Sequence, residues 1–152
     1  MTTSPRNESD TVDESRDAFA HQLLNLARTL KIDPLVAENQ VLDRVALSFR
    51  KLLNFLAQHA ELTEIYLLAY PSKGTSPSGT VKAQLTAIMQ DNFADAHSGG
   101  IFRKDIPIAL LADFFTALLL QLVQIPADPQ GRHQQSLAAT RLFCEGAWLG
   151  KE

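Results

Sequence analysis

The apolar residues of this chain recur at three- and four-residue spacing, which is the period of helices that bury one face. No segment shows the strict alternation of a half-buried β-strand. The pattern therefore predicts an all-α fold, a bundle of five to seven helices without a sheet, a repeat or a second domain. We expect residues 1–14, which are polar and acid-rich, to form a disordered tail, and residues 15–152 to form one helical domain.

Polar residues that can cap helices indicate where the first helices begin. Asp13 or Ser15 stands before the first apolar stripe and can cap it. Asp33 followed by Pro34 has the pattern of a cap and a first helical residue. We therefore expect a long second helix to begin there and to run to about His59.

The middle of the chain combines a short helix, a loop and a longer helix. The short helix is expected at 61–69, and a segment rich in turn-forming residues follows at 71–79. Ser78 or Thr80 can cap the next helix, and the Gly99-Gly100 pair is expected to end it near residue 97.

Residues 106–125 form the most apolar segment, and they are apolar around more of the helix than packing on one side requires. We expect Asp105 to cap this helix, and Asp128 with Pro129 to start the last one. A central core helix and a helix that also contacts a second subunit both explain the composition. A membrane span does not, because the segment is barely long enough for a bilayer and Asp113 lies near its middle.

Composition narrows the possible functions. The net charge of −3 and the lack of a Lys/Arg cluster argue against nucleic-acid binding by this chain alone. The N-terminus resembles neither a signal nor a transit peptide, so the cytoplasm is the expected location. The histidines form no metal-binding pair, Cys144 lies in an apolar context that favours a buried, inert thiol, and no nucleotide-binding or hydrolase motif is present. We therefore expect no metal, no cofactor and no enzymatic activity.

Three segments share their order and spacing with a known family. They are residues 55–62 (FLAQHAEL) followed by Tyr66, residues 100–106 (GIFRKDI) leading into Ala112 and Phe115, and residues 143–146 (FCEG). Together they resemble the C-terminal regulatory domain of TetR-family transcriptional regulators. The family usually has a proline where this chain has Ala60, whereas the glycine, basic residue and aspartate before the next-to-last long helix match better.

The resemblance implies a ligand-sensing and dimerisation domain that forms a homodimer. Its last two long helices, here about 107–125 and 130–149, would pair with their counterparts in a second copy. The interface residues this implies are Leu111, Phe114, Leu118, Leu122, Leu137, Phe143 and Ala147. The preceding helices would wall a pocket for a small hydrophobic effector, with the candidate lining residues Phe49, Leu52, Phe55, Tyr66, Met89, Phe93 and Phe115.

Family members also carry a helix-turn-helix domain before the regulatory domain, and this chain has no room for one. We therefore expect it to act on transcription through a DNA-binding segment or partner outside this chain. The alternative is an interaction protein without DNA-binding activity that forms mixed dimers with a full-length regulator. A small helical enzyme is a third hypothesis, for which the sequence offers no paired acid and base.

Overall fold

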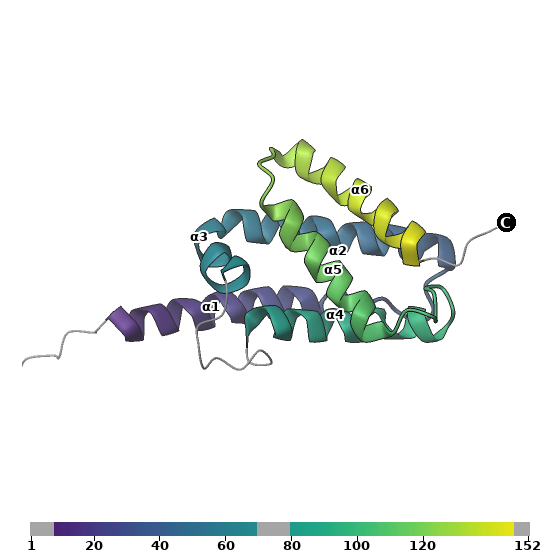
Figure 1. Cartoon of the computed structure of the whole chain (residues 1–152), viewed down its shortest axis with the longest axis horizontal. Helices are drawn as coiled ribbons and strands as arrows, with labels where there is room; N and C mark the ends of the chain where they lie inside the picture. The colour runs from purple at the N-terminus through teal and green to yellow at the C-terminus, as the bar shows by residue number, and fades with distance from the viewer. Residues whose placement is uncertain (1–7, 70–79, 148–152) are drawn as a thin grey trace, which may run out of the picture.

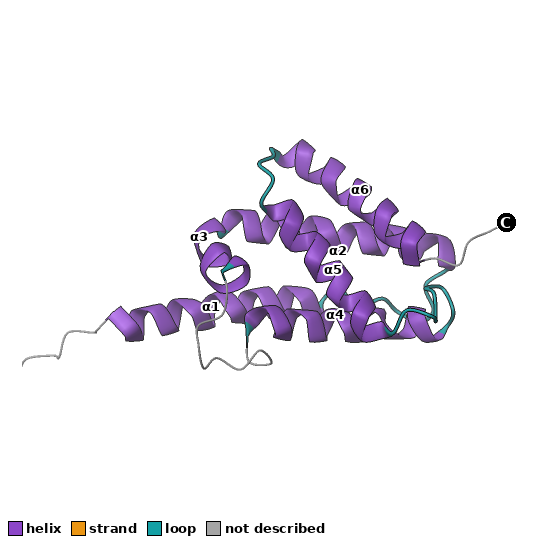
Figure 2. Ribbon diagram, viewed as in Figure 1, coloured by secondary structure: helices purple, strands orange, loops and turns teal. Residues whose placement is uncertain are grey.

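The computed structural model describes residues 8–69 and 80–147. Most of these residues form helices, which short loops connect, and they contain no strand, which confirms the predicted all-α bundle (Figure 2). Residues 1–7 of the expected tail and the expected loop at 71–79 lie outside the described residues. The elements are α1 (Glu8–Arg28), α2 (Glu38–Gln58), α3 (Ala60–Thr63), the π-helical turn η1 (Glu64–Leu68), α4 (Val81–Ser98), α5 (Ile108–Val123) and α6 (Pro129–Ala147).

Helix α2 lies at the centre of the bundle and packs against α1, α5 and α6 (Figure 1). Helix α4 lies beside α1 and packs closely against α5. The side of α5 that faces the core therefore contacts α2 and α4. Helix α6 packs mainly on α2 and less closely on α5. This arrangement leaves the outer sides of α5 and α6 next to each other at the surface.

Four phenylalanine rings form the centre of the core. The rings of Phe49 and Phe115 lie 4.3 Å apart between centroids, and Phe93 lies 5.2 Å from Phe115. Phe143 brings α6 into the same cluster, 5.9 Å from both Phe93 and Phe115. All four are buried, and such ring pairs add to the hydrophobic free energy of burial. The cluster therefore joins α2, α4, α5 and α6.

Several predicted helix ends are confirmed. Thr80 caps α4, because its hydroxyl oxygen accepts a hydrogen bond from the Ala83 amide at 3.1 Å. Gly100 follows the end of α4 with a φ of 82°, a conformation that favours glycine. The carboxylate of Asp128 accepts from the Gly131 amide at 2.7 Å, where α6 begins at Pro129.

The predicted caps at Asp33 and Asp105 are wrong. Asp33 and Pro34 form a turn instead of a helix start, because the Asp33 carboxylate accepts from the Leu35 amide at 2.8 Å and α2 begins only at Glu38. Asp105 does not cap α5, which has Pro107 in the cap position. The Asp105 carboxylate instead pairs with Arg103, which lies two residues before it.

The first helix begins earlier than expected. It begins at Glu8 and ends at Arg28, so residues 8–14 of the expected tail are helical, and Asp13 and Ser15 lie inside the helix instead of capping it. The short helix expected at 61–69 consists of α3 and η1, and it is separated from α2 by His59, whose φ of −120° and ψ of 48° are not helical. Within the described residues, no helix is both long enough and apolar enough to span a bilayer.

Candidate functional site

An apolar groove lies on the outer surface between α5 and α6. It has a volume of about 400 Å³. Phe114 and Leu142 are its most exposed large side chains, with 47% and 64% of their surfaces accessible. We call it the α5–α6 groove, and it is lined by Ile106, Leu111, Phe114, Ala117, Leu118, Leu142 and Phe143.

The sequence of α5 explains this groove. One line of the helix faces the core and includes Leu111, Phe115 and Leu119, which are buried. A second apolar line, Leu110, Phe114 and Leu118, follows at intervals of four residues and stays partly exposed. Exposed apolar side chains gathered on two neighbouring helices are characteristic of surfaces that bind other molecules. The α5–α6 groove is therefore a candidate interaction surface.

Each of the two helices also carries an exposed charged side chain outside the groove. Asp113 lies on α5 and Arg141 on α6, and neither lines the groove. Neither forms an ion pair with another described residue. The two helices thus offer one acid and one base of opposite sign to a partner.

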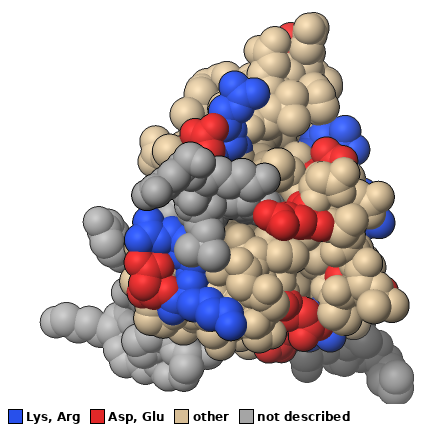
Figure 3. Space-filling view, turned by 90° about the vertical axis from the view of Figure 1, so that its right-hand side faces the viewer, with Lys and Arg blue, Asp and Glu red and all other residues tan. Residues whose placement is uncertain are grey.

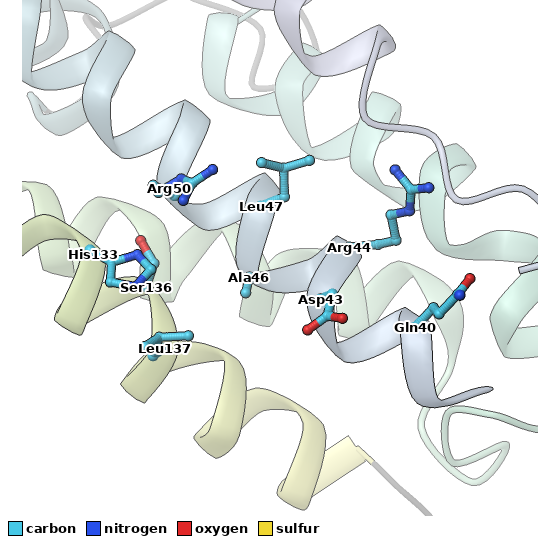
Figure 4. Close-up of a pocket in the computed structure, with 9 residues that line it drawn as sticks. All are labelled: Gln40, Asp43, Arg44, Ala46, Leu47, Arg50, His133, Ser136 and Leu137. Atoms are coloured by element: carbon cyan, nitrogen blue, oxygen red, sulfur yellow. The ribbon is translucent and has the colours of Figure 1, made fainter. Parts of the chain in front are cut away.

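A more polar groove separates α2 from α6 on another side of the bundle (Figure 4). Asp43 and Ala46 of α2 face α6, whereas the Arg44 side chain points away from it. His133 and Ser136 line the α6 side. The Ser136 hydroxyl already donates to a carbonyl of its own helix, that of Arg132, at 2.8 Å. The polar groups of this groove therefore do not converge on one point.

A third hollow, of about 490 Å³, lies where α2 bends into α3, beside the end of α5 and the start of α6. The surface that it exposes is mostly polar, and Glu64, Gln124 and Arg132 line it together with small and apolar residues. We call it the Arg132 pocket, and its residues are Leu56, Ala57, Ala60, Thr63, Glu64, Leu68, Ala69, Val123, Gln124 and Arg132.

Arg132 is a functional candidate in this pocket that sequence reasoning missed. Its side chain is only 8% exposed, although arginine is seldom buried. The terminal nitrogen Nη1 donates to the Leu122 carbonyl at 2.9 Å and to the Gln135 side chain at 3.1 Å. Nε is buried and has no hydrogen-bond partner. The one available signal was register, because Arg132 is four residues before Ser136 on the buried face of α6.

The face of the molecule shown in Figure 3 carries charges of both signs. No metal site is evident in the described part of the chain. On the end of the molecule in Figure 3, Lys and Arg side chains lie beside Asp and Glu side chains. The residues described contain no cluster of three or more His, Cys, Asp or Glu that could hold a metal ion. Cys144 is buried, as expected, and burial raises the pKa of its thiol to about 12.

The residues expected at a dimer interface lie in different environments. Phe114 and Leu118 line the α5–α6 groove, and Leu122 is partly buried one turn further along α5. Leu111 and Phe143 form the buried floor of that groove. Leu137 is half exposed but lines the α2–α6 groove instead. The Ala147 side chain lies outside the described residues.

The residues expected to line a hydrophobic pocket lie mostly in the core. Phe49, Leu52, Met89, Phe93 and Phe115 are each 0% exposed. The remaining two, Phe55 and Tyr66, are partly buried, and both pack near the ring of Phe19, at 5.8 Å and 6.3 Å. None of the seven lines any of the three hollows described above.

Comparison with models of protein families, with curated proteins and with solved structures found no match for this chain.

Proposed function

We propose that the chain is the dimerising, ligand-sensing domain of a TetR-like transcriptional regulator. It acts on DNA through a segment or partner outside this chain. The α5–α6 groove carries the proposal, because it places exposed apolar side chains on the two helices that the family resemblance assigns to the dimer interface. Phe114, Leu118 and Leu142 are then the main contacts, while Leu111 and Phe143 support them from below.

A second copy of this chain is the partner that we propose for the groove. A two-fold interface brings the same surface together with itself, so a self-complementary surface needs charges of both signs. Asp113 on α5 and Arg141 on α6 are an exposed acid and an exposed base on the two helices, outside the groove itself. In the proposed dimer, Asp113 of one protomer faces Arg141 of the other, and the symmetry creates this contact twice. The apolar side chains supply most of the free energy of association, and the charges fix the register.

Charge reversal tests this arrangement by sedimentation equilibrium. Asp113→Arg and Arg141→Asp each place like charges opposite each other at two symmetric contacts. Each variant is expected to raise the dimer dissociation constant about 10-fold, on the scale of exposed ion pairs. The double variant exchanges the two charges and is expected to restore the dissociation constant to within about 3-fold of that of the unmodified protein.

Asp91→Arg is the matched control, because Asp91 is an exposed aspartate on α4, away from the groove. It changes the net charge as Asp113→Arg does and is expected to leave the dissociation constant unchanged. If the double variant dimerises no better than the two single variants, Asp113 and Arg141 do not face each other. If Phe114→Ser also leaves the dissociation constant unchanged, the α5–α6 groove is not the interface.

A further inference from the structure

Arg132 is a buried cation without a counterion in the described part of the chain. Its guanidinium stays protonated at any physiological pH. The ion pairs found there involve other arginines, Arg16 with Asp17 and Arg103 with Asp105. Moving a charge out of water without a paired opposite charge is costly, so buried charges are normally paired. Arg132 therefore needs a physical explanation.

Helix capping explains one part of its position. Leu122 lies in the last turn of α5, whose carbonyl groups form the negative end of that helix. The Leu122 carbonyl accepts from the Ile125 amide at 3.0 Å, and Arg132 adds a second hydrogen bond from Nη1, which gives its charge partial compensation. This role uses Nη1 only, and it gives the other two nitrogens nothing to bind.

The two remaining nitrogens lie on one edge of the guanidinium group. Nε is enclosed and lacks a partner, and Nη2 forms no hydrogen bond with any described residue. Together, Nε and Nη2 present two parallel N–H groups, which match the two oxygens of a carboxylate. Arg132 also lines a hollow of about 490 Å³, which is large enough for a small organic molecule.

We propose that the Arg132 pocket binds a small organic monocarboxylate. One carboxylate oxygen accepts from Nε and the other from Nη2, after a small movement of the side chains that cover Nε. The short apolar part of the ligand contacts Leu68 and Val123, which line the same hollow and are partly exposed. The bound carboxylate supplies the counterion that the protein itself does not.

Glu64 sets the preferred charge of the ligand. Its carboxylate lines the same hollow and repels anions, and the repulsion grows with the charge of the ligand. A monocarboxylate is therefore favoured over phosphate, which carries more charge at neutral pH. A monocarboxylate would then be the effector of the proposed sensing domain, and this regulatory role rests on that proposed function. The pocket shares no residue with the α5–α6 groove, so binding and dimerisation can be measured separately.

Butyrate is a suitable probe, and butyramide has nearly the same shape without the charge. We expect butyrate, titrated at constant ionic strength, to shift the Arg132 Nε–H signal in nitrogen-15 NMR spectra and to saturate in the millimolar range. Butyramide and inorganic phosphate are expected to bind at least about 10-fold more weakly. Arg132→Lys keeps the charge but loses the two parallel N–H groups, and is expected to weaken butyrate binding about 10-fold. Glu64→Gln is expected to strengthen it about 3-fold by removing repulsion.

Arg28→Met is the matched control for Arg132→Met, because Arg28 is an exposed arginine on α1 that lines none of the three hollows. Arg132→Met is expected to abolish butyrate binding and Arg28→Met to leave it unchanged, with circular dichroism confirming that both variants fold. If butyramide binds as well as butyrate, if phosphate binds more tightly, or if a folded Arg132→Met variant still binds butyrate, the inference is overturned. Masses measured on the same samples separate the two proposals: a monomer that binds butyrate contradicts only the proposed dimer, and a dimer that does not bind contradicts only the ligand site.

Discussion

Phe115→Ala tests whether the aromatic rings at the centre of the bundle form a close-packed core or the wall of a ligand cavity. Phe115 is fully buried and lies within 6 Å of three other rings, at 4.3, 5.2 and 5.9 Å between centroids. A close-packed ring loses all of these contacts on truncation. A ring that lines an empty cavity has fewer to lose, because one of its sides touches nothing.

The expected loss follows from this packing. Truncating a buried phenylalanine to alanine lowers the free energy of unfolding by about 3 to 5 kcal/mol. Each ring pair is worth about 0.5 to 1.5 kcal/mol beyond simple burial, so three pairs place Phe115→Ala near the upper end, at about 4 to 5 kcal/mol. Total stabilities of domains are about 5 to 15 kcal/mol, so this variant is expected to be only marginally folded. Phe115→Leu, which keeps most of the volume, is expected to lose about 1 to 2 kcal/mol.

Urea unfolding followed by circular dichroism measures these losses, and the neighbouring residue provides the control. Phe114 is 47% exposed, so Phe114→Ala is expected to lose about 1 kcal/mol or less at protein concentrations that favour the monomer. At higher concentrations its loss should grow, because dimerisation adds to the stability of the unmodified protein. The loss for Phe115→Ala should show no such growth. A loss below about 1.5 kcal/mol for Phe115→Ala would refute close packing and restore the cavity interpretation.

Three further predictions concern single groups. Asn92→Ala removes a buried hydrogen bond of 2.8 Å to the Ala27 carbonyl, which joins α4 to α1, and is expected to lower the free energy of unfolding in urea by about 1 to 2 kcal/mol. The pKa of Cys144 is about 12 in the folded state against a usual value of 9.0, so only the unfolded thiol releases its proton between these values. Stability should therefore fall as the pH rises from about 9 toward 12; Cys144→Ala should remove this contribution, and an unchanged pH profile would contradict it. Asp128→Ala is expected to lower the thermal midpoint by removing the cap on the Gly131 amide, worth about 1 kcal/mol, while Asp128→Asn keeps the acceptor and most of the stability.

Local patterns predicted the helices and many of their ends. Thr80 caps α4 and Asp128 caps α6, as predicted. At the cap position, an acceptor side chain meets an unpaired backbone amide two or three residues later. Asp33 and Asp105 have the same residue type, yet nearer partners take their carboxylates, the Leu35 amide and Arg103. Sequence spacing alone cannot decide between such competing partners.

The candidate sites depended on contacts that spacing does not encode. A ring in the core and a ring on a pocket wall are equally apolar, so the sequence could not distinguish Phe115 from a ligand contact. Residues on the groove side of α5, such as Phe114, could be predicted from the sequence, because the helix carries more apolar surface than one neighbour can cover. Arg132 was not, because its burial results from the meeting of α5 and α6, which the chain brings together only in the fold.

Light scattering on the purified chain over a range of concentrations tests the proposed dimer most directly. We predict a mass of twice the 16.8 kDa of one chain at micromolar concentrations, and a shift toward the single-chain mass on Phe114→Ser. A mass of 16.8 kDa at every concentration up to the millimolar range would contradict the dimer and, with it, the proposed regulatory role of the α5–α6 groove.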